Sequence, residues 1–233
     1  SGTCGVNAAL RDGAVVVASS DVLLDLGSSS SSSGVINMGS VAPDAVTVAA
    51  VPELSRIGKN HGVLIPASSP APVPAPAPVV ATAVAVGTYL QKPSEQLMTD
   101  CGAFCVPSQP TSVWIDTGVV IATGSAYRSL LSLLDDTVTS RCTERGINRY
   151  GQHLRLELYS DMLLALQVGP LPSSRETYFD RLGLPLPASA SASASDSITD
   201  ADARVVLFET LRGVPLYMTP VPTGTFCHLG TSV

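Results

Sequence analysis

Short apolar runs bounded by turn-forming residues recur along this chain, and they limit its fold more than any other feature. Several runs are rich in β-branched residues, which favour strands. They lie at 14–18, 21–26, 35–38, 44–51, 62–65 and 79–90. The 79–90 run is almost uncharged, as in a strand buried on both faces. A spacing of about ten residues between such runs is typical of a β-sandwich or barrel.

Three further pairs of runs predict β-hairpins, because only a short turn separates the two members of each pair. The pairs are 112–116 with 119–123, 153–159 with 162–168, and 204–211 with 214–218. Hairpins join antiparallel strands, whereas parallel neighbours need long crossovers. The predicted fold is therefore all-β, an antiparallel sandwich or jelly-roll-like barrel.

One segment, 125–145, has a helical period instead of a strand period. Its apolar residues recur at intervals of three and four, and Gly146 follows as a stop signal. The stripe comprises Tyr127, Leu130, Leu131, Leu134, Val138 and Cys142. We expect one amphipathic helix that flanks the sheet and buries Leu131 and Leu134.

The length of 233 residues is compatible with a single β-rich domain over 1–233. Proline occupies every second position of 70–78, which predicts an extended arm or crossover. The segments 28–34 and 185–197 are low-complexity loops.

Composition excludes several classes of function. The net charge is −6, with only 14% charged residues, so a basic face that binds nucleic acid is not expected. An apolar run of 18 residues is absent from the sequence, and no membrane span is predicted. The sequence also lacks glycine-rich nucleotide-binding loops and the common hydrolase motifs, which argues against an enzyme.

The sharpest catalytic candidate is the triplet Asp100-Cys101-Gly102. It resembles the nucleophile turn Gly-Asp-Cys-Gly of the chymotrypsin-like cysteine proteases of small RNA viruses. The resemblance implies Cys101 as nucleophile, His61 as general base and the turn amides as oxyanion hole. Thr99 replaces the first glycine of that turn. A protease that processes a viral polyprotein is therefore the alternative hypothesis. The leading hypothesis is a structural protein without catalytic residues.

The leading hypothesis rests on low charge, abundant small residues and long Ser-, Pro- and Ala-rich loops. These features look similar to those of capsid or spike proteins of viruses with GC-rich genomes. They predict a self-assembling structural protein located in the virion, or otherwise soluble. Its expected partners are copies of itself or other capsid subunits, with a host receptor as a further candidate.

No metal or cofactor is expected. The five cysteines cannot all pair within the chain, so most are predicted to be free, buried thiols. Cys101 and Cys105 have the spacing of half a metal site but lack a second pair. Asp135 and Asp136 are interpreted as a solvated helix face, and Trp114 as a core anchor.

Overall fold

The computed structural model describes residues 14–18, 22–25, 41–67, 83–106, 109–133, 156–166, 168–169, 174–187, 200–222 and 224–228. The predicted strand at 35–38, the loop at 28–34 and the arm at 70–78 lie outside these residues. So do Asp135, Asp136 and most of the 185–197 loop. Residues 185–187 are described and form neither helix nor strand.

Strands and helices alternate along the chain more than the sequence suggested. The strands are β1 (Ala14–Ala18), β2 (Val22–Asp25), β3 (Val46–Leu54), β4 (Gly62–Pro66), β5 (Val84–Gln91), β6 (Ser112–Thr123), β7 (Leu216–Pro220) and β8 (Thr225–His228). The helices are α1 (Ser55–Gly58), α2 (Glu95–Asp100), α3 (Gly124–Ser132), the π-helix η4 (Leu158–Leu163), α4 (Arg175–Arg181) and α5 (Asp200–Leu211).

The main sheet closes into a barrel. Its strand order is β1-β6-β3-β7-β5-β4, and β4 also pairs with β6. Five strands, β6, β3, β7, β5 and β4, therefore form a closed ring, with β1 attached outside it along β6. All pairs in this sheet are antiparallel except β3 with β7. The prediction of a β-dominated fold is confirmed, but the sheet is mixed and is not clearly a sandwich.

The first predicted hairpin is wrong, because 112–123 is the single continuous strand β6. Gly118 has a φ of 76°, and the register between β3 and β6 shifts beside it, between Val48 and Ala50. The Thr117 hydroxyl donates to the carbonyl of Ala49 across this irregularity, at 2.9 Å. The Thr-Gly pair that resembles a turn thus forms a β-bulge, which bends the strand without reversing it.

The other two predicted hairpins are also wrong. Residues 204–211 belong to α5, whose buried residues Ala203, Leu207, Phe208 and Leu211 follow the period of a helix. Only the second half of that pair is a strand, β7, which is parallel to β3. The 158–163 stretch is η4 instead of a strand. Residues 153–155 lie outside the part of the chain that is described.

The flanking helix is present, but α3 covers Gly124–Ser132, and residues 134–145 are not among those described. Ala126 and Leu133 are buried, and Tyr127 and Leu130 pack against the core. Leu131 is 43% exposed, so the expectation of its burial is wrong. Leu134, Val138 and Cys142 of the predicted stripe lie beyond the described end of α3.

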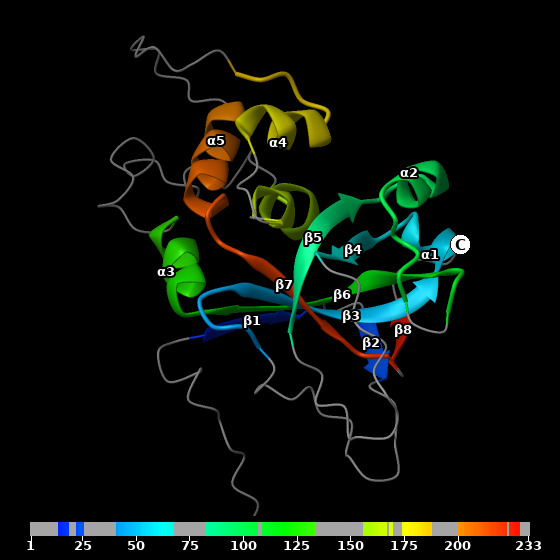
Figure 1. Cartoon of the computed structure of the whole chain (residues 1–233). Coiled ribbons are helices and arrows are strands. Elements are labelled where there is room, and N and C mark those ends of the chain that lie inside the picture. The colour runs from blue at the N-terminus through cyan, green and yellow to red at the C-terminus, as the bar shows by residue number, and fades with distance from the viewer. Residues whose placement is uncertain are drawn as a thin grey trace, which may run out of the picture.

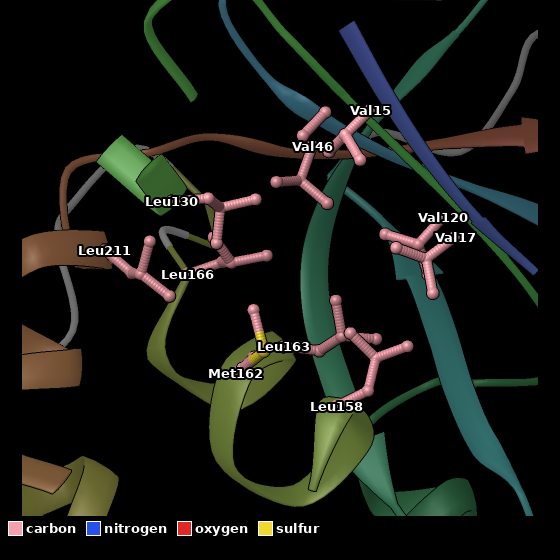
Figure 2. A pocket seen from close by; sticks show the side chains of 11 residues that line it. Val15, Val17, Val46, Val120, Leu130, Leu158, Met162, Leu163, Leu166 and Leu211 are labelled. Carbon is pink, nitrogen blue, oxygen red and sulfur yellow. The ribbon is translucent and has the colours of Figure 1, made fainter. Parts of the chain in front are cut away.

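Helices α3, η4, α4 and α5 pack on one side of the barrel over an apolar layer, whereas α1 and α2 lie at the other end against a smaller apolar cluster (Figure 1). Tyr178 stacks on Phe208 and meets Phe179 edge to face. A cavity of about 40 Å³ remains between β1, β6, α3 and η4 (Figure 2). Its lining is wholly apolar, with Val15, Val120, Leu130 and Met162 among the side chains. Such a cavity offers no polar partner for water and is a packing gap.

The burial of β5 differs from the expectation. Within it Val86 and Tyr89 are buried, while most of its other residues are only half-buried. Trp114 is buried as expected, with 2% of its surface exposed. Among the helices that the structure describes, none is long and apolar enough to cross a bilayer.

Candidate functional site

The Asp100-Cys101-Gly102 triplet forms the end of helix α2. Gly102 has a φ of 69°, and its N–H donates to the carbonyl of Thr99 at 3.0 Å. The N–H of Ala103 donates to the carbonyl of Met98 at 2.8 Å. This pair of bonds defines a Schellman motif, in which glycine accepts the left-handed conformation.

The resemblance to a nucleophile turn is therefore not matched by the geometry. An oxyanion hole needs amide N–H groups that point outward at the reacting atom. Here the N–H groups of Cys101, Gly102 and Ala103 are all used inside the turn. Cys101 is half-buried and packs against a small apolar cluster that includes Met98. Cys101 and Cys105 are both free thiols, as expected.

Replacing Gly102 by alanine should cost about 1–2 kcal/mol of stability, because an L-residue is strained at this φ. A Cβ at Gly102 would meet no atom within 4 Å, so backbone strain is the only cost. Gly213→Ala is the matched control, since its Cβ also meets nothing and its φ is not positive. Thermal unfolding of the two variants should differ by several degrees. Equal melting temperatures would contradict the Schellman assignment.

His61 lies instead beside a group of polar side chains at one end of the barrel. It precedes β4, its carbonyl accepts the N–H of Lys92 at 3.0 Å, and its own N–H donates to Gly58. Gly62, the next residue, pairs with Gln91 at the end of β5. The α1–β4 turn and the β5–α2 turn are thereby joined. We call the polar residues at this junction, His61, Gly62, Tyr89, Gln91, Lys92 and Asp116, the β4–β5 cluster.

Asp116 is the buried acid of the cluster. It lies in β6 just before the bulge, with 4% of its surface exposed. The Tyr89 hydroxyl lies 3.5 Å from Asp116 Oδ2 and 2.9 Å from Gln91 Oε1. The backbone N–H groups of Gly62 and Gly118 also donate to the carboxylate. A Cβ at Gly62 would overlap the Asp116 carboxylate and the Tyr89 ring, so only glycine fits there.

Burial dominates the electrostatics of this carboxylate. Loss of water raises the pKa of Asp116 to about 7, although the bonds from Gly62, Tyr89 and Gly118 oppose the shift. Burial and the neighbouring Asp116 charge also raise the pKa of Tyr89 well above its ordinary value. A buried group that titrates near neutral pH is typical of functional sites.

Lys92 brings a cation and a strained backbone to the same junction. Its φ is 47°, and Asp44 is the only other residue besides glycine with a positive φ in the described ranges. Such strain is concentrated at functional sites. The sequence contains two lysines, and the other, Lys59, is in the adjoining α1–β4 turn. Both lysines are exposed, so this end of the barrel presents positive charge above a buried acid.

The cluster can bind an anion through Lys92 and polar groups through Gln91. The sequence reasoning found only His61 of these residues, and gave it another role. Two features of the sequence could have indicated the other residues of the cluster. Asp116 is the one charged residue in the apolar 112–123 segment, and Lys92 is one of two lysines. In the part of the chain that is described, three or more His, Cys, Asp or Glu side chains never gather as a metal would require.

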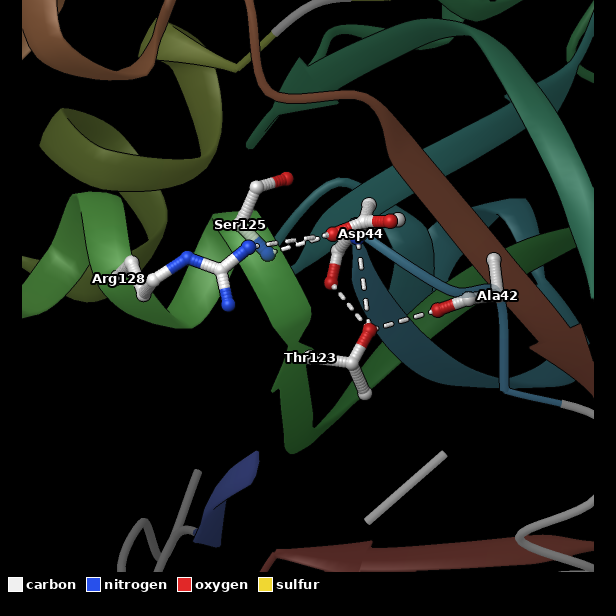
Figure 3. A network of polar contacts seen from close by, with 6 residues as sticks. Ala42, Asp44, Thr123, Ser125 and Arg128 are labelled. Atoms are coloured by element: carbon white, nitrogen blue, oxygen red, sulfur yellow. Dashed lines mark hydrogen bonds and ion pairs between the residues drawn. The ribbon is translucent and has the colours of Figure 1, made fainter. Parts of the chain in front are cut away.

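A second polar region lies around the start of α3, at the other end of the barrel (Figures 1 and 3). The Ser125 N–H donates to Asp44 Oδ1 at 2.6 Å, and this bond lowers the pKa of Asp44. The Thr123 hydroxyl donates to the Ala42 carbonyl at 2.8 Å. These contacts fix the entry into α3, and an open groove of about 480 Å³ beside it is lined by Ser125, Ser129, Glu209 and Arg212.

That groove is a weaker candidate, because its charges already pair with each other. Glu209 accepts from Arg175 at 2.7 Å and from Arg212 at 2.9 Å. The cluster at the β4–β5 end combines a strained backbone at Lys92, a buried carboxylate with a raised pKa and two exposed lysines. It is therefore the candidate functional site.

Comparison with known protein families gives an independent result. The model of the fucose pyrophosphorylase domain matches residues 3–233, which is nearly the whole chain. The chain belongs to the fucose pyrophosphorylase family. No curated protein matches the sequence significantly. Membership overturns both hypotheses drawn from the sequence, because this is a family of nucleotidyltransferase-type enzymes.

The prediction of a viral capsid or spike protein is therefore wrong, and so is that of a viral cysteine protease. The virion is not supported as a location. Low charge and Ala-, Ser- and Pro-rich segments therefore did not discriminate between a capsid protein and a member of this enzyme family.

Proposed function

We propose that the chain takes part in activating fucose, and that the β4–β5 cluster binds the sugar phosphate. In this reaction a phosphate oxygen of fucose 1-phosphate attacks the α-phosphorus of a nucleoside triphosphate. The bond between the α-phosphorus and the bridging oxygen breaks, and pyrophosphate leaves. Nucleoside diphosphate-fucose is the second product. The family match over residues 3–233 carries this proposal.

The cluster offers chemistry that suits a sugar phosphate. Lys92 presents an exposed ammonium group, and a lysine is a common phosphate ligand. Gln91, half-buried beside it, can bond a sugar hydroxyl through its amide. The backbone bond from Lys92 to the His61 carbonyl holds the two turns together, which fixes these groups relative to each other.

Magnesium bound with substrate phosphates usually needs one or two carboxylates. Asp116 does not fit that role, because it is buried and directed at Tyr89 and two backbone amides. Within the cluster, the contribution of these side chains is therefore binding and orientation. We assign no step to a metal there.

Lys92→Ala should weaken the binding of fucose 1-phosphate about tenfold or more, as for loss of one charge-assisted hydrogen bond. Isothermal titration of the purified chain measures this. Arg212→Ala is the control, because it removes an exposed cation in the groove beside α3, away from the cluster. Equal loss in both variants, or no loss in Lys92→Ala, would contradict the placement of the site.

A further inference from the structure

The Tyr89 hydroxyl lies between two hydrogen-bond acceptors, Gln91 and Asp116, and can donate to only one of them. Its hydroxyl oxygen lies 2.9 Å from Gln91 Oε1 and 3.5 Å from Asp116 Oδ2. A phenol donates a single hydrogen bond but can also accept one. The direction of the Tyr89 hydroxyl must therefore depend on whether Asp116 carries a proton.

The two protonation states give two arrangements of the same atoms. When Asp116 is neutral, its O–H can donate to the Tyr89 oxygen, and Tyr89 is free to donate to Gln91. When Asp116 is ionised, the carboxylate needs a donor, and a bond to an anion is stronger than one to an amide. Tyr89 then turns its proton toward Asp116, and the Gln91 oxygen loses its donor.

We propose that Asp116 and Tyr89 form a proton-dependent relay that holds Gln91 in place beside Lys92 when Asp116 is protonated and releases it when Asp116 is ionised. Tyr89 is thus a positioning residue, which acts on the ligand site through Gln91. The consequence for ligand affinity rests on the proposed function, whereas the relay itself does not.

The surroundings of Asp116 allow this relay to work near neutral pH. From β5 it faces Tyr89, and Tyr159 of η4 adds a second phenol close to Tyr89. From β4 it meets the N–H of Gly62, which follows the titratable His61, and β3 contributes the uncharged Ala50 opposite it. Burial has the largest influence on the Asp116 carboxyl and raises its pKa to about 7, against the opposing bonds from Gly62, Tyr89 and Gly118. Both arrangements are then populated between pH 6 and 8.

The first test observes Gln91 directly, without ligand. In a chain labelled with ¹⁵N-glutamine, the side-chain amide signal of Gln91 should shift with a midpoint near pH 7, and Tyr89→Phe should abolish the shift. The signal is assigned by its absence in Gln91→Asn. Gln96 is an internal control, because its amide bonds the exposed Asp100 at 2.8 Å instead. His61→Gln should keep the shift, which excludes the neighbouring imidazole as its source.

The second test compares fucose 1-phosphate affinity in the natural chain and in Tyr89→Phe at pH 6 and 8. The ratio between the two proteins cancels titration of the phosphate itself. This ratio should change about two- to tenfold between pH 6 and 8, which corresponds to one hydrogen bond.

A Gln91 signal that does not move with pH, or moves equally in Tyr89→Phe, would overturn the relay. A constant affinity ratio would overturn its effect on binding. Absence of binding at every pH would contradict the proposed function, while the Gln91 signal would still decide the relay.

Discussion

Arg204→Met is expected to lower the free energy of unfolding by about 3–5 kcal/mol, as when one partner of a buried ion pair is lost. Arg204 Nε lies 2.7 Å from Asp161 Oδ1, and the two side chains are 15% and 3% exposed. The pair joins α5 to η4. Asp161 Oδ2 also accepts the N–H of Glu157 at 2.8 Å, and its carbonyl accepts the Tyr178 hydroxyl at 3.2 Å. Removing the guanidinium leaves a buried carboxylate without its cation at the junction of these helices.

Urea unfolding followed by the fluorescence of Trp114, the single tryptophan, measures the loss. Arg212→Met is the matched control. Its ion pair with Glu209 is 51% and 38% exposed, and exposed pairs contribute about 0–1 kcal/mol. The double variant Arg204→Met with Asp161→Asn should recover part of the lost stability, because it no longer buries a lone charge. If Arg204→Met loses as little stability as is expected for Arg212→Met, the buried pair contributes little to the free energy of unfolding.

The sequence predicted most strands but not how they connect. Runs such as 14–18, 44–51 and 62–65 correspond to β1, β3 and β4, because β-branched residues suit a pleated surface. Closure of the barrel depends on the pairing of β4 with β6, whose residues Val63 and Ile115 are far apart in sequence. Local patterns carry no information about such a pair. Residues 204–211 were misassigned because the short apolar run at 205–208 is compatible with a strand or a buried helix.

The candidate site was harder to predict than the fold. Its residues come from β4, β5 and β6 and from the turns beside β4 and β5, and each looks ordinary within its own segment. Asp116 gains its unusual properties only when Gly62 and Tyr89 close over it from two other strands. Conversely, the Asp100-Cys101-Gly102 triplet looked catalytic as a sequence, but its glycine serves to end a helix. A three-residue motif alone therefore cannot distinguish a nucleophile turn from the end of a helix.

Burial of Asp116 should make the whole chain less stable as the pH rises from about 4 to above 7. Its pKa is about 7 in the folded chain and 3.8 when exposed. Well below pH 3.8 the carboxyl is protonated in both states. Between these values the folded chain keeps a proton that the unfolded chain loses, so raising the pH favours unfolding. The shift corresponds to about 4 kcal/mol at 1.36 kcal/mol for each pH unit.

Asp116→Asn should remove this loss, because an amide in the same place never ionises. The variant should match the natural chain near pH 4 and exceed its stability by up to about 4 kcal/mol near pH 8. Asp44→Asn is the control. The carboxyl of Asp44 is exposed and its pKa is lowered by the Ser125 N–H, so its stabilising contribution is lost at acid pH instead. Between pH 5 and 8 the Asp44→Asn variant should therefore follow the slope of the natural chain. Parallel slopes in all three proteins would show that Asp116 is already ionised well below neutral pH, and that the buried carboxylate is stabilised by more than the two backbone amides and Tyr89.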